Sequence, residues 1–135
     1  MPRLIAMAAP RDVLPALAIR CYEQTEIASE IGKEENRQLY DALLENTRRN
    51  MHIIVQTTKL VRALNDASIN PLLLKGTAQL LTVNREKPGF RKQADIDLVV
   101  PPNSLVAAAE ALQAEGYCFY QANKVFETQP GILGD

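Results

Sequence analysis

Hydrophobic residues in the first half of the chain recur at helical spacing and predict two helices. The first is expected to start at Asp12, whose carboxylate suits an N-cap, and to continue to Ile27. Gly32 would end it, and a longer helix is then expected over residues 33–68. The opposite face of that helix is charged, and its expected buried face carries Tyr40, Leu44, Met51, Ile54, Val61 and Leu64.

The second half changes to short apolar runs separated by turn residues, which is typical of strands alternating with helices. Asn70 and Pro71 favour an extended backbone into residues 72–74, an unbroken leucine run that indicates a strand buried on both faces. The further elements expected are a short helix over 77–83, a polar loop over 84–93, a strand over 96–100 stopped by two prolines, and an amphipathic helix over 105–112.

The order of these elements predicts an α/β (α+β) fold, in which helices pack on a small mixed β-sheet that is preceded by two N-terminal helices. Two β-prone runs, residues 117–120 and 124–126, are expected to contribute further strand structure. Three regions follow from this order: an N-terminal helical region packed on the core, an α/β core, and a loose tail, which span residues 1–68, 69–128 and 129–135.

Composition and charge narrow the class of protein. The formal net charge of -1 over 135 residues gives no general attraction to nucleic acid or to anionic membranes. Cys21 and Cys118 form neither a disulfide framework nor a metal-ligand spacing. No apolar run approaches the ~18 residues that a membrane span needs. We therefore expect a cytoplasmic protein with no membrane association.

The most informative chemistry is a pair of carboxylates in the second expected strand. On a strand, Asp95 and Asp97 would project from the same side, roughly 6–7 Å apart. Two negative charges at that separation repel by about 2–3 kcal/mol at an effective dielectric near 20. A divalent cation between them would offset this cost.

Taken together, the motifs of this chain resemble those of the nucleotidyltransferase superfamily, which has the DNA polymerase beta-like fold. The more specific similarity is to uncharacterised bacterial nucleotidyltransferase-like proteins, and it covers about residues 60–120. The matching elements are Leu73-Leu74-Lys75-Gly76, Arg91, Asp95-Ile96-Asp97-Leu98-Val99-Val100 and Gly116-Tyr117.

This resemblance implies a Mg²⁺-dependent domain that transfers a nucleoside monophosphate from a nucleoside triphosphate (NTP) to an unknown acceptor. Asp95 and Asp97 would bind Mg²⁺ or Mn²⁺ and be the catalytic carboxylates. The triphosphate would lie against Lys75, Gly76, Thr77 and Arg91.

Simpler interpretations stay open for the same residues. Lys75 and the aspartate pair could be solvated surface groups, and Arg91 could be an ion-pair partner of Asp95 or Asp97. The superfamily also adds a third carboxylate on a later strand, and Glu127 is the only in-strand candidate for that third metal ligand. On this comparison the chain looks short at its C-terminal end.

Two rival hypotheses follow from that departure. One is a catalytically incomplete domain that still binds nucleotide or metal. The other is an antitoxin-like module that binds a protein partner through Tyr40, Leu44, Met51 and Ile54 on the long helix.

Overall fold

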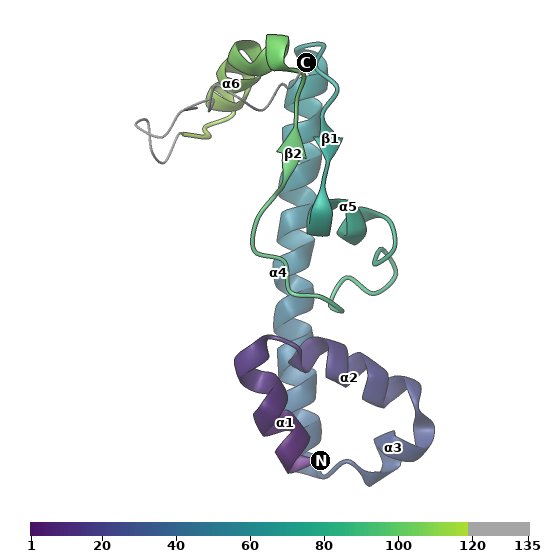
Figure 1. Cartoon of the computed structure of the whole chain (residues 1–135). Coiled ribbons are helices and arrows are strands. Elements are labelled where there is room, and N and C mark those ends of the chain that lie inside the picture. The colour runs from purple at the N-terminus through teal and green to yellow at the C-terminus, as the bar shows by residue number, and fades with distance from the viewer. Residues whose placement is uncertain (119–135) are drawn as a thin grey trace, which may run out of the picture.

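One long helix, α4 (Lys33–Asp66), runs through the molecule, and the other elements are arranged along it (Figure 1). A computed structural model describes residues 1–118 of the chain. The expected strand structure beyond residue 118, Glu127 and the tail over 129–135 lie outside these residues. The long helix confirms the prediction for 33–68, and it ends two residues earlier at Asp66.

Short helices gather at the N-terminal end of α4 (Figure 1). They are α1 (Pro2–Ala8), the 3₁₀ turn η1 (Ala9–Arg11), α2 (Leu14–Glu23) and α3 (Thr25–Glu30). The prediction of one helix from Asp12 to Ile27 was wrong in two respects. An extended Gln24 divides it, and Asp12 caps nothing, because it has a left-handed φ of 55° and its carboxylate contacts Lys92 at 2.7 Å.

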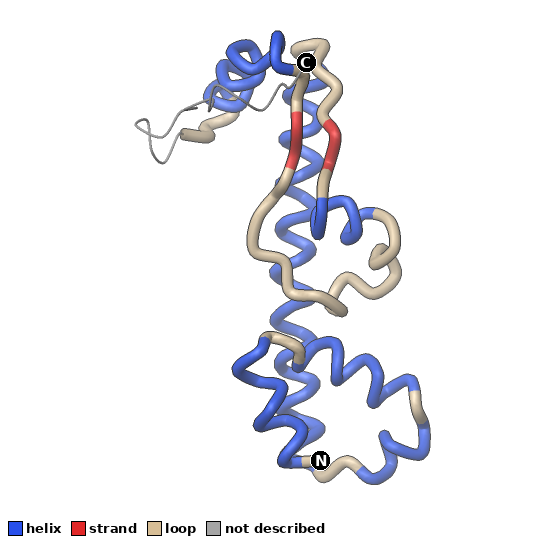
Figure 2. Tube along the Cα trace, viewed as in Figure 1, coloured by secondary structure: helices blue, strands red, loops and turns tan. Residues whose placement is uncertain are grey.

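The C-terminal half of the described chain lies along the rest of α4. Its elements are β1 (Leu72–Leu73), α5 (Lys75–Leu81), β2 (Leu98–Val99), η2 (Pro102–Ser104) and α6 (Leu105–Ala114). Helices dominate, and the two strands are short (Figure 2). The fold is therefore a mixed α/β arrangement that is mostly helical.

The two strands pair in antiparallel orientation, with Leu72 opposite Val99 and Leu73 opposite Leu98. One further backbone bond, from Leu74 N to Asp97 O at 3.0 Å, extends the pairing. The prediction that the leucine strand is buried on both faces was wrong, because Leu72 is 64% exposed. Within residues 1–118 only one face of this ribbon packs on other elements, as an antiparallel pair permits.

Two small hydrophobic clusters lie at opposite ends of α4. The first joins the N-terminal helices to Leu39, through Ile5, Ala18 and Cys21. The second packs Leu64 against Ile69 and Ala108, with Leu98, Val100 and Leu112 at its edge. The middle of α4 is packed differently, with polar side chains on its buried face.

The buried face of α4 agrees with the predicted one only in part, because Leu64 is buried as expected and other predicted positions are half-buried or exposed. Tyr40 and Met51 are 56% and 46% exposed. From Asn46 onward the buried positions repeat at alternating spacings of four and three residues, and Leu39 lies seven residues before Asn46, so that they form a helical seam with polar members: they are Leu39, Asn46, Asn50, Ile53, Thr57, Leu60 and Leu64. Two asparagines and a threonine on this seam concealed it from a search for apolar residues.

Candidate functional site

The candidate site lies where the connection between α5 and β2 passes the start of α5. This connection, residues 82–97, contains turns but no helix or strand. Connections longer than about 12–15 residues without regular structure are uncommon and are often functional. Contacts with α4 and with the N-terminal helices fix the course of this connection.

Buried asparagines of α4 hold the connection in place. Asn46 Nδ2 donates a hydrogen bond to Gly89 O at 2.7 Å. Asn50 Nδ2 donates to Arg91 O at 2.7 Å and also to Pro88 O. These hydrogen bonds give the carbonyls of the connection a donor. They also give the asparagine amides a partner, and this is why amide side chains can lie in the buried seam of α4.

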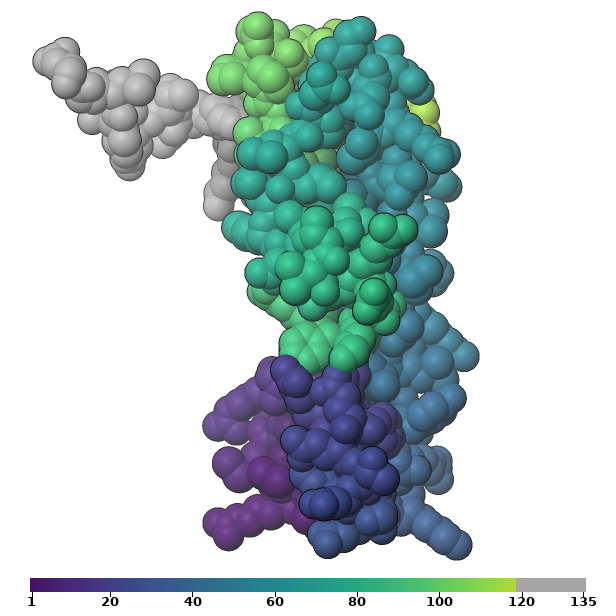
Figure 3. All heavy atoms as spheres, turned by 90° about the vertical axis from the view of Figure 1, so that its right-hand side faces the viewer, coloured from purple at the N-terminus to yellow at the C-terminus, as the bar shows by residue number. Residues whose placement is uncertain are grey.

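The N-terminal helices hold the connection from its other side. Lys87 pairs with Glu23, and Lys92 Nζ lies 2.7 Å from Asp12 Oδ1. The Arg20 guanidinium stacks over Phe90, 5.7 Å from the ring centroid. Figure 3 shows the green atoms of the connection resting on the blue atoms of the N-terminal helices.

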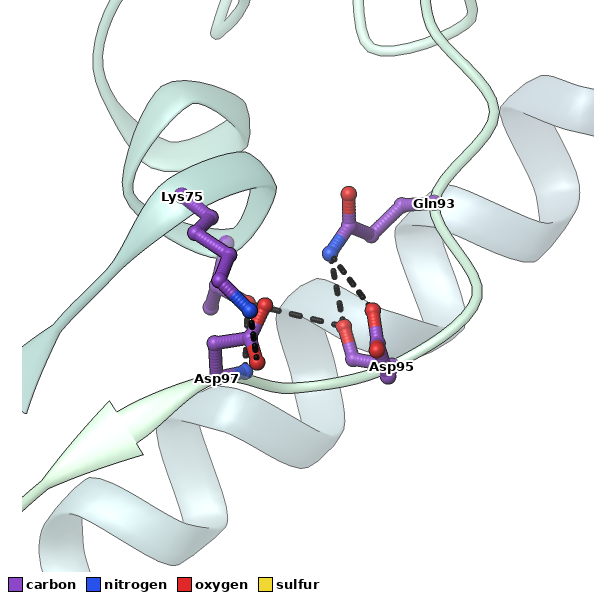
Figure 4. A network of polar contacts seen from close by, with 5 residues as sticks. Lys75, Gln93, Asp95 and Asp97 are labelled. Atoms are coloured by element: carbon purple, nitrogen blue, oxygen red, sulfur yellow. Dashed lines mark hydrogen bonds and ion pairs between the residues drawn. The ribbon is translucent and has the colours of Figure 1, made fainter.

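Asp95 and Asp97 reach the start of α5 at the end of this connection. The expected strand over 96–100 is shorter in the structure, so both Asp95 and Asp97 lie before β2, in chain that forms no regular strand. Asp97 Oδ1 lies 3.2 Å from Lys75 Nζ, whereas the Asp95 carboxylate turns toward Gln93 (Figure 4). The structure thus brings Lys75 and the two aspartates together, with each carboxylate on a different partner.

Thr77 fixes the backbone between the two aspartates. Its hydroxyl accepts a hydrogen bond from Asp97 N at 3.0 Å, and Asp95 O lies 3.5 Å away. Thr77 is fully buried, and Gly76 beside it is buried as well. Neither presents a side chain to solvent, so both shape the turn that carries Lys75.

Lys75 itself has a backbone conformation that is unusual for a residue with a side chain. Its φ is 47°, in the left-handed region, where contact of the β-carbon with the backbone costs roughly 1–2 kcal/mol. Such strain is concentrated at functional sites. The Lys75 side chain is 73% exposed, so its ion pair with Asp97 is open to solvent and weak.

Arg91 was expected either to contact the triphosphate or to pair with an aspartate, and in the structure it contacts a glutamine of α5. Its guanidinium donates to Gln79 Oε1 on α5 at 2.6 Å, and it makes no ion pair with Asp95 or Asp97. The alternative that Arg91 is a salt-bridge partner of the aspartates is therefore wrong for this structure. The side chain is exposed on the α5 side of the connection.

Gln93 is the site residue that sequence reasoning missed. It is only 5% exposed, and its amide nitrogen donates to Asp95 O at 2.7 Å (Figure 4). It also lines a hollow of about 560 Å³ against α4, together with Glu45, Arg49, His52, Ile53, Gln56 and Ala94. No local pattern marks a glutamine in a polar loop as buried, so only its position two residues before Asp95 offered a signal.

Within residues 1–118, no third His, Cys, Asp or Glu side chain joins the aspartates in a group that could hold a metal ion. The oxygen donors at the site are the two carboxylates, which are hard ligands of the kind that Mg²⁺ and Mn²⁺ accept. The donor chemistry therefore fits such an ion, with substrate or water oxygens completing its coordination.

Comparison with known protein families assigns the chain to one of them. The model of a family described as uncharacterised nucleotidyltransferase matches residues 1–129. The chain belongs to this family. Membership of this family indicates nucleotidyl transfer as the general class of reaction. The match includes the N-terminal helices as well as the candidate site. No curated protein and no solved structure gave a significant match.

The helices of the described region do not have the character of membrane spans. Over residues 1–118, none combines the length and the apolar character that crossing a bilayer demands. The long helix α4 has the length, but charged residues cover its exposed side.

Proposed function

We propose that this chain binds an NTP together with Mg²⁺ or Mn²⁺ and transfers its nucleoside monophosphate to an acceptor. The observation that carries the proposal is the convergence of Lys75, Asp95 and Asp97 at the turn into α5, within 3.2 Å for the Lys75–Asp97 pair. Family membership supports the reaction class.

Asp95 and Asp97 would hold the metal ion. Asp95 is exposed, and among residues 1–118 Asp97 is paired only with a lysine that solvent already reaches, so a cation can replace that lysine at little cost. When bound, the ion would neutralise phosphate charge and polarise the phosphoryl group that is transferred.

The nucleotide would bind through the residues around this pair. Lys75, released from Asp97, would be free to pair with a phosphate, and Arg91 would supply a bidentate contact from the α5 side. Gly76 and Thr77 are buried, so they would contribute backbone N–H groups and the shape of the turn. The hollow lined by Gln93 and Ala94, the two residues that precede Asp95, has the volume of a small-molecule site, although none of the residues assigned to the metal or the triphosphate lines it.

Transfer of label from an α-labelled NTP tests the proposal. We expect Mg²⁺-dependent labelling by the wild-type protein, supplied with a cell extract as the source of acceptor, and a fall to background for Asp95→Asn and Asp97→Asn. Asp41→Asn is the matched control, because Asp41 lies on α4 in an exposed pair with Arg37. Equal, background-level labelling by wild type and both site variants would contradict nucleotidyl transfer by this chain.

A second candidate function is a partner-binding module that binds nucleotide or metal without turnover. One observation favours it: Tyr40, Met51 and Val55 form an exposed apolar stripe on one side of α4. With a second copy of the chain as the partner, this candidate predicts self-association that Met51→Glu abolishes in analytical ultracentrifugation, and NTP binding without label transfer. A monomer at every concentration, with transfer intact, would rule it out.

A further inference from the structure

Gln93 contacts two parts of the candidate site, Asp95 and the turn at Gly76. Its amide nitrogen donates to Asp95 O at 2.7 Å, and Asp95 Oδ1 lies 3.4 Å from the same nitrogen. The first bond is short and the second long, so the amide holds the backbone firmly and steers the carboxylate weakly. This glutamine is the side chain toward which the Asp95 carboxylate turns (Figure 4).

The other side of the same amide packs against Gly76. A β-carbon built on Gly76 would lie 1.9 Å from Gln93 Oε1 and 2.7 Å from its Cδ. Gly76 does not have a positive φ, so conformational freedom does not explain a glycine here. The space that a side chain at position 76 would need is already occupied by the Gln93 amide.

Gln93 thus contacts Gly76 and Asp95 at once, and its side chain is almost fully buried. Its amide is neutral, so it supplies a hydrogen-bond donor to Asp95 without adding a charge that would compete with a metal ion. Groups behind metal-binding carboxylates have this effect in many proteins, because they orient the ligand before the metal arrives.

We propose that Gln93 is a positioning residue for the metal site: its amide fixes the backbone of Asp95, and so places the Asp95 carboxylate for binding the ion at a set distance from the Gly76 turn. This inference rests on the proposed function, because it assumes that Asp95 binds a metal. It assigns Gln93 no contact with substrate.

Mn²⁺ binding tests the inference without any knowledge of the acceptor. Paramagnetic broadening of the amide signals of residues 93–97 reports on Mn²⁺ at the site, and the signal loss against Mn²⁺ concentration yields a dissociation constant. We expect Gln93→Met, which keeps the length of the side chain but removes its donor, to raise that constant tenfold or more. Gln38→Met is the control, because Gln38 is an exposed glutamine on α4 whose amide contacts only Glu34.

Thermal unfolding of the same samples separates positioning from a purely structural contribution. A structural contribution alone would lower the Tm and leave the dissociation constant of the folded protein unchanged, and that result would overturn the inference. Wild-type protein that shows no broadening at residues 93–97 would overturn the proposed metal site itself, and with it this inference. The two failures are therefore distinguishable.

Gly76→Ala provides a second test if Gln93→Met does not fold. The new methyl group meets the end of a flexible side chain, so the Gln93 amide should move aside and the fold should survive. We expect weakened Mn²⁺ binding, and a smaller loss of Tm when the same change is made in a Gln93→Ala background, where the space is open. Equal Tm losses in both backgrounds, or unchanged Mn²⁺ binding in Gly76→Ala, would overturn the inference.

Discussion

At the scale of single residues, the candidate site includes a lysine whose backbone conformation is unfavourable for a residue with a side chain. Lys75 takes a left-handed φ that a glycine would adopt without strain, although a glycine follows it directly. The exposed side chain of Lys75 contributes little to stability through its ion pair. The strained lysine is thus explained better by its charge next to Asp97 than by folding.

Replacing Lys75 tests this explanation. Lys75→Gly relieves the strain and should be more stable than Lys75→Ala by about 1 kcal/mol, since both variants lose the charge but only alanine keeps a β-carbon. Both should lose most of the label transfer. Urea unfolding measures the difference in stability. Equal stability of the two variants would show that the left-handed conformation carries no cost.

At the scale of elements, α4 holds the 82–97 connection through amide side chains rather than through apolar contacts. Asn50 is fully buried, and its Nδ2 satisfies two backbone carbonyls, while its Oδ1 has no hydrogen-bond partner in the described part of the chain. Hydrogen bonds of this kind specify where a loop lies, because a shifted loop would leave buried carbonyls unpaired. The position of Asp95 thus depends on a helix face some forty residues earlier in the chain.

Removing the Asn50 side chain should therefore destabilise the protein. We expect Asn50→Ala to lower the free energy of unfolding by about 1–3 kcal/mol, because two carbonyls lose their donor. Asn65→Ala, at the exposed end of the same helix, should change it by less than about 0.5 kcal/mol. Urea unfolding followed by circular dichroism measures both values. A similar, small change in the two variants would mean that Asn50 does not anchor the connection.

At the scale of the whole molecule, α4 carries a hydrophobic cluster at each end and the connection between them (Figure 1). Two ion pairs join this connection to the N-terminal helices. The hydrogen bond from Lys87 to Glu23 lowers the pKa of the Glu23 carboxyl, and the positive charges of Lys87 and Arg20 add to this effect.

The lowered pKa of Glu23 predicts a pH dependence with a definite sign. A carboxyl whose pKa is lower in the folded state stabilises the fold above its unfolded pKa, and this stabilisation is lost as the pH falls through the folded pKa. The Tm difference between wild type and Glu23→Gln should therefore be largest near neutral pH and shrink below the ordinary Glu value of 4.5. Thermal unfolding from pH 7 to pH 3 measures it, with Glu26→Gln as control. A difference that does not change with pH would contradict the Lys87 contact.

The sequence by itself determined where most of the main elements lie and which residues make up the candidate site. Gly32 and Pro71 bound the long helix and the first strand, and Pro101 follows the second strand closely, because backbone preferences at glycine and proline act locally. Asp95 and Asp97 were identifiable from residue type and spacing, and the structure places Lys75 beside them. These features need no knowledge of distant contacts.

Only the tertiary structure decided which side chains are buried and what holds the site together. Asn50 and Gln93 are polar residues that local rules assign to the surface, yet both are buried, because backbone groups far along the chain or across a turn satisfy their amides. The same long-range bonding left Tyr40 outside and drew Asp12 away from its helix to Lys92. A polar side chain can be buried when a hydrogen-bond partner is available to it, and the fold, rather than the neighbouring residues, decides which group is that partner.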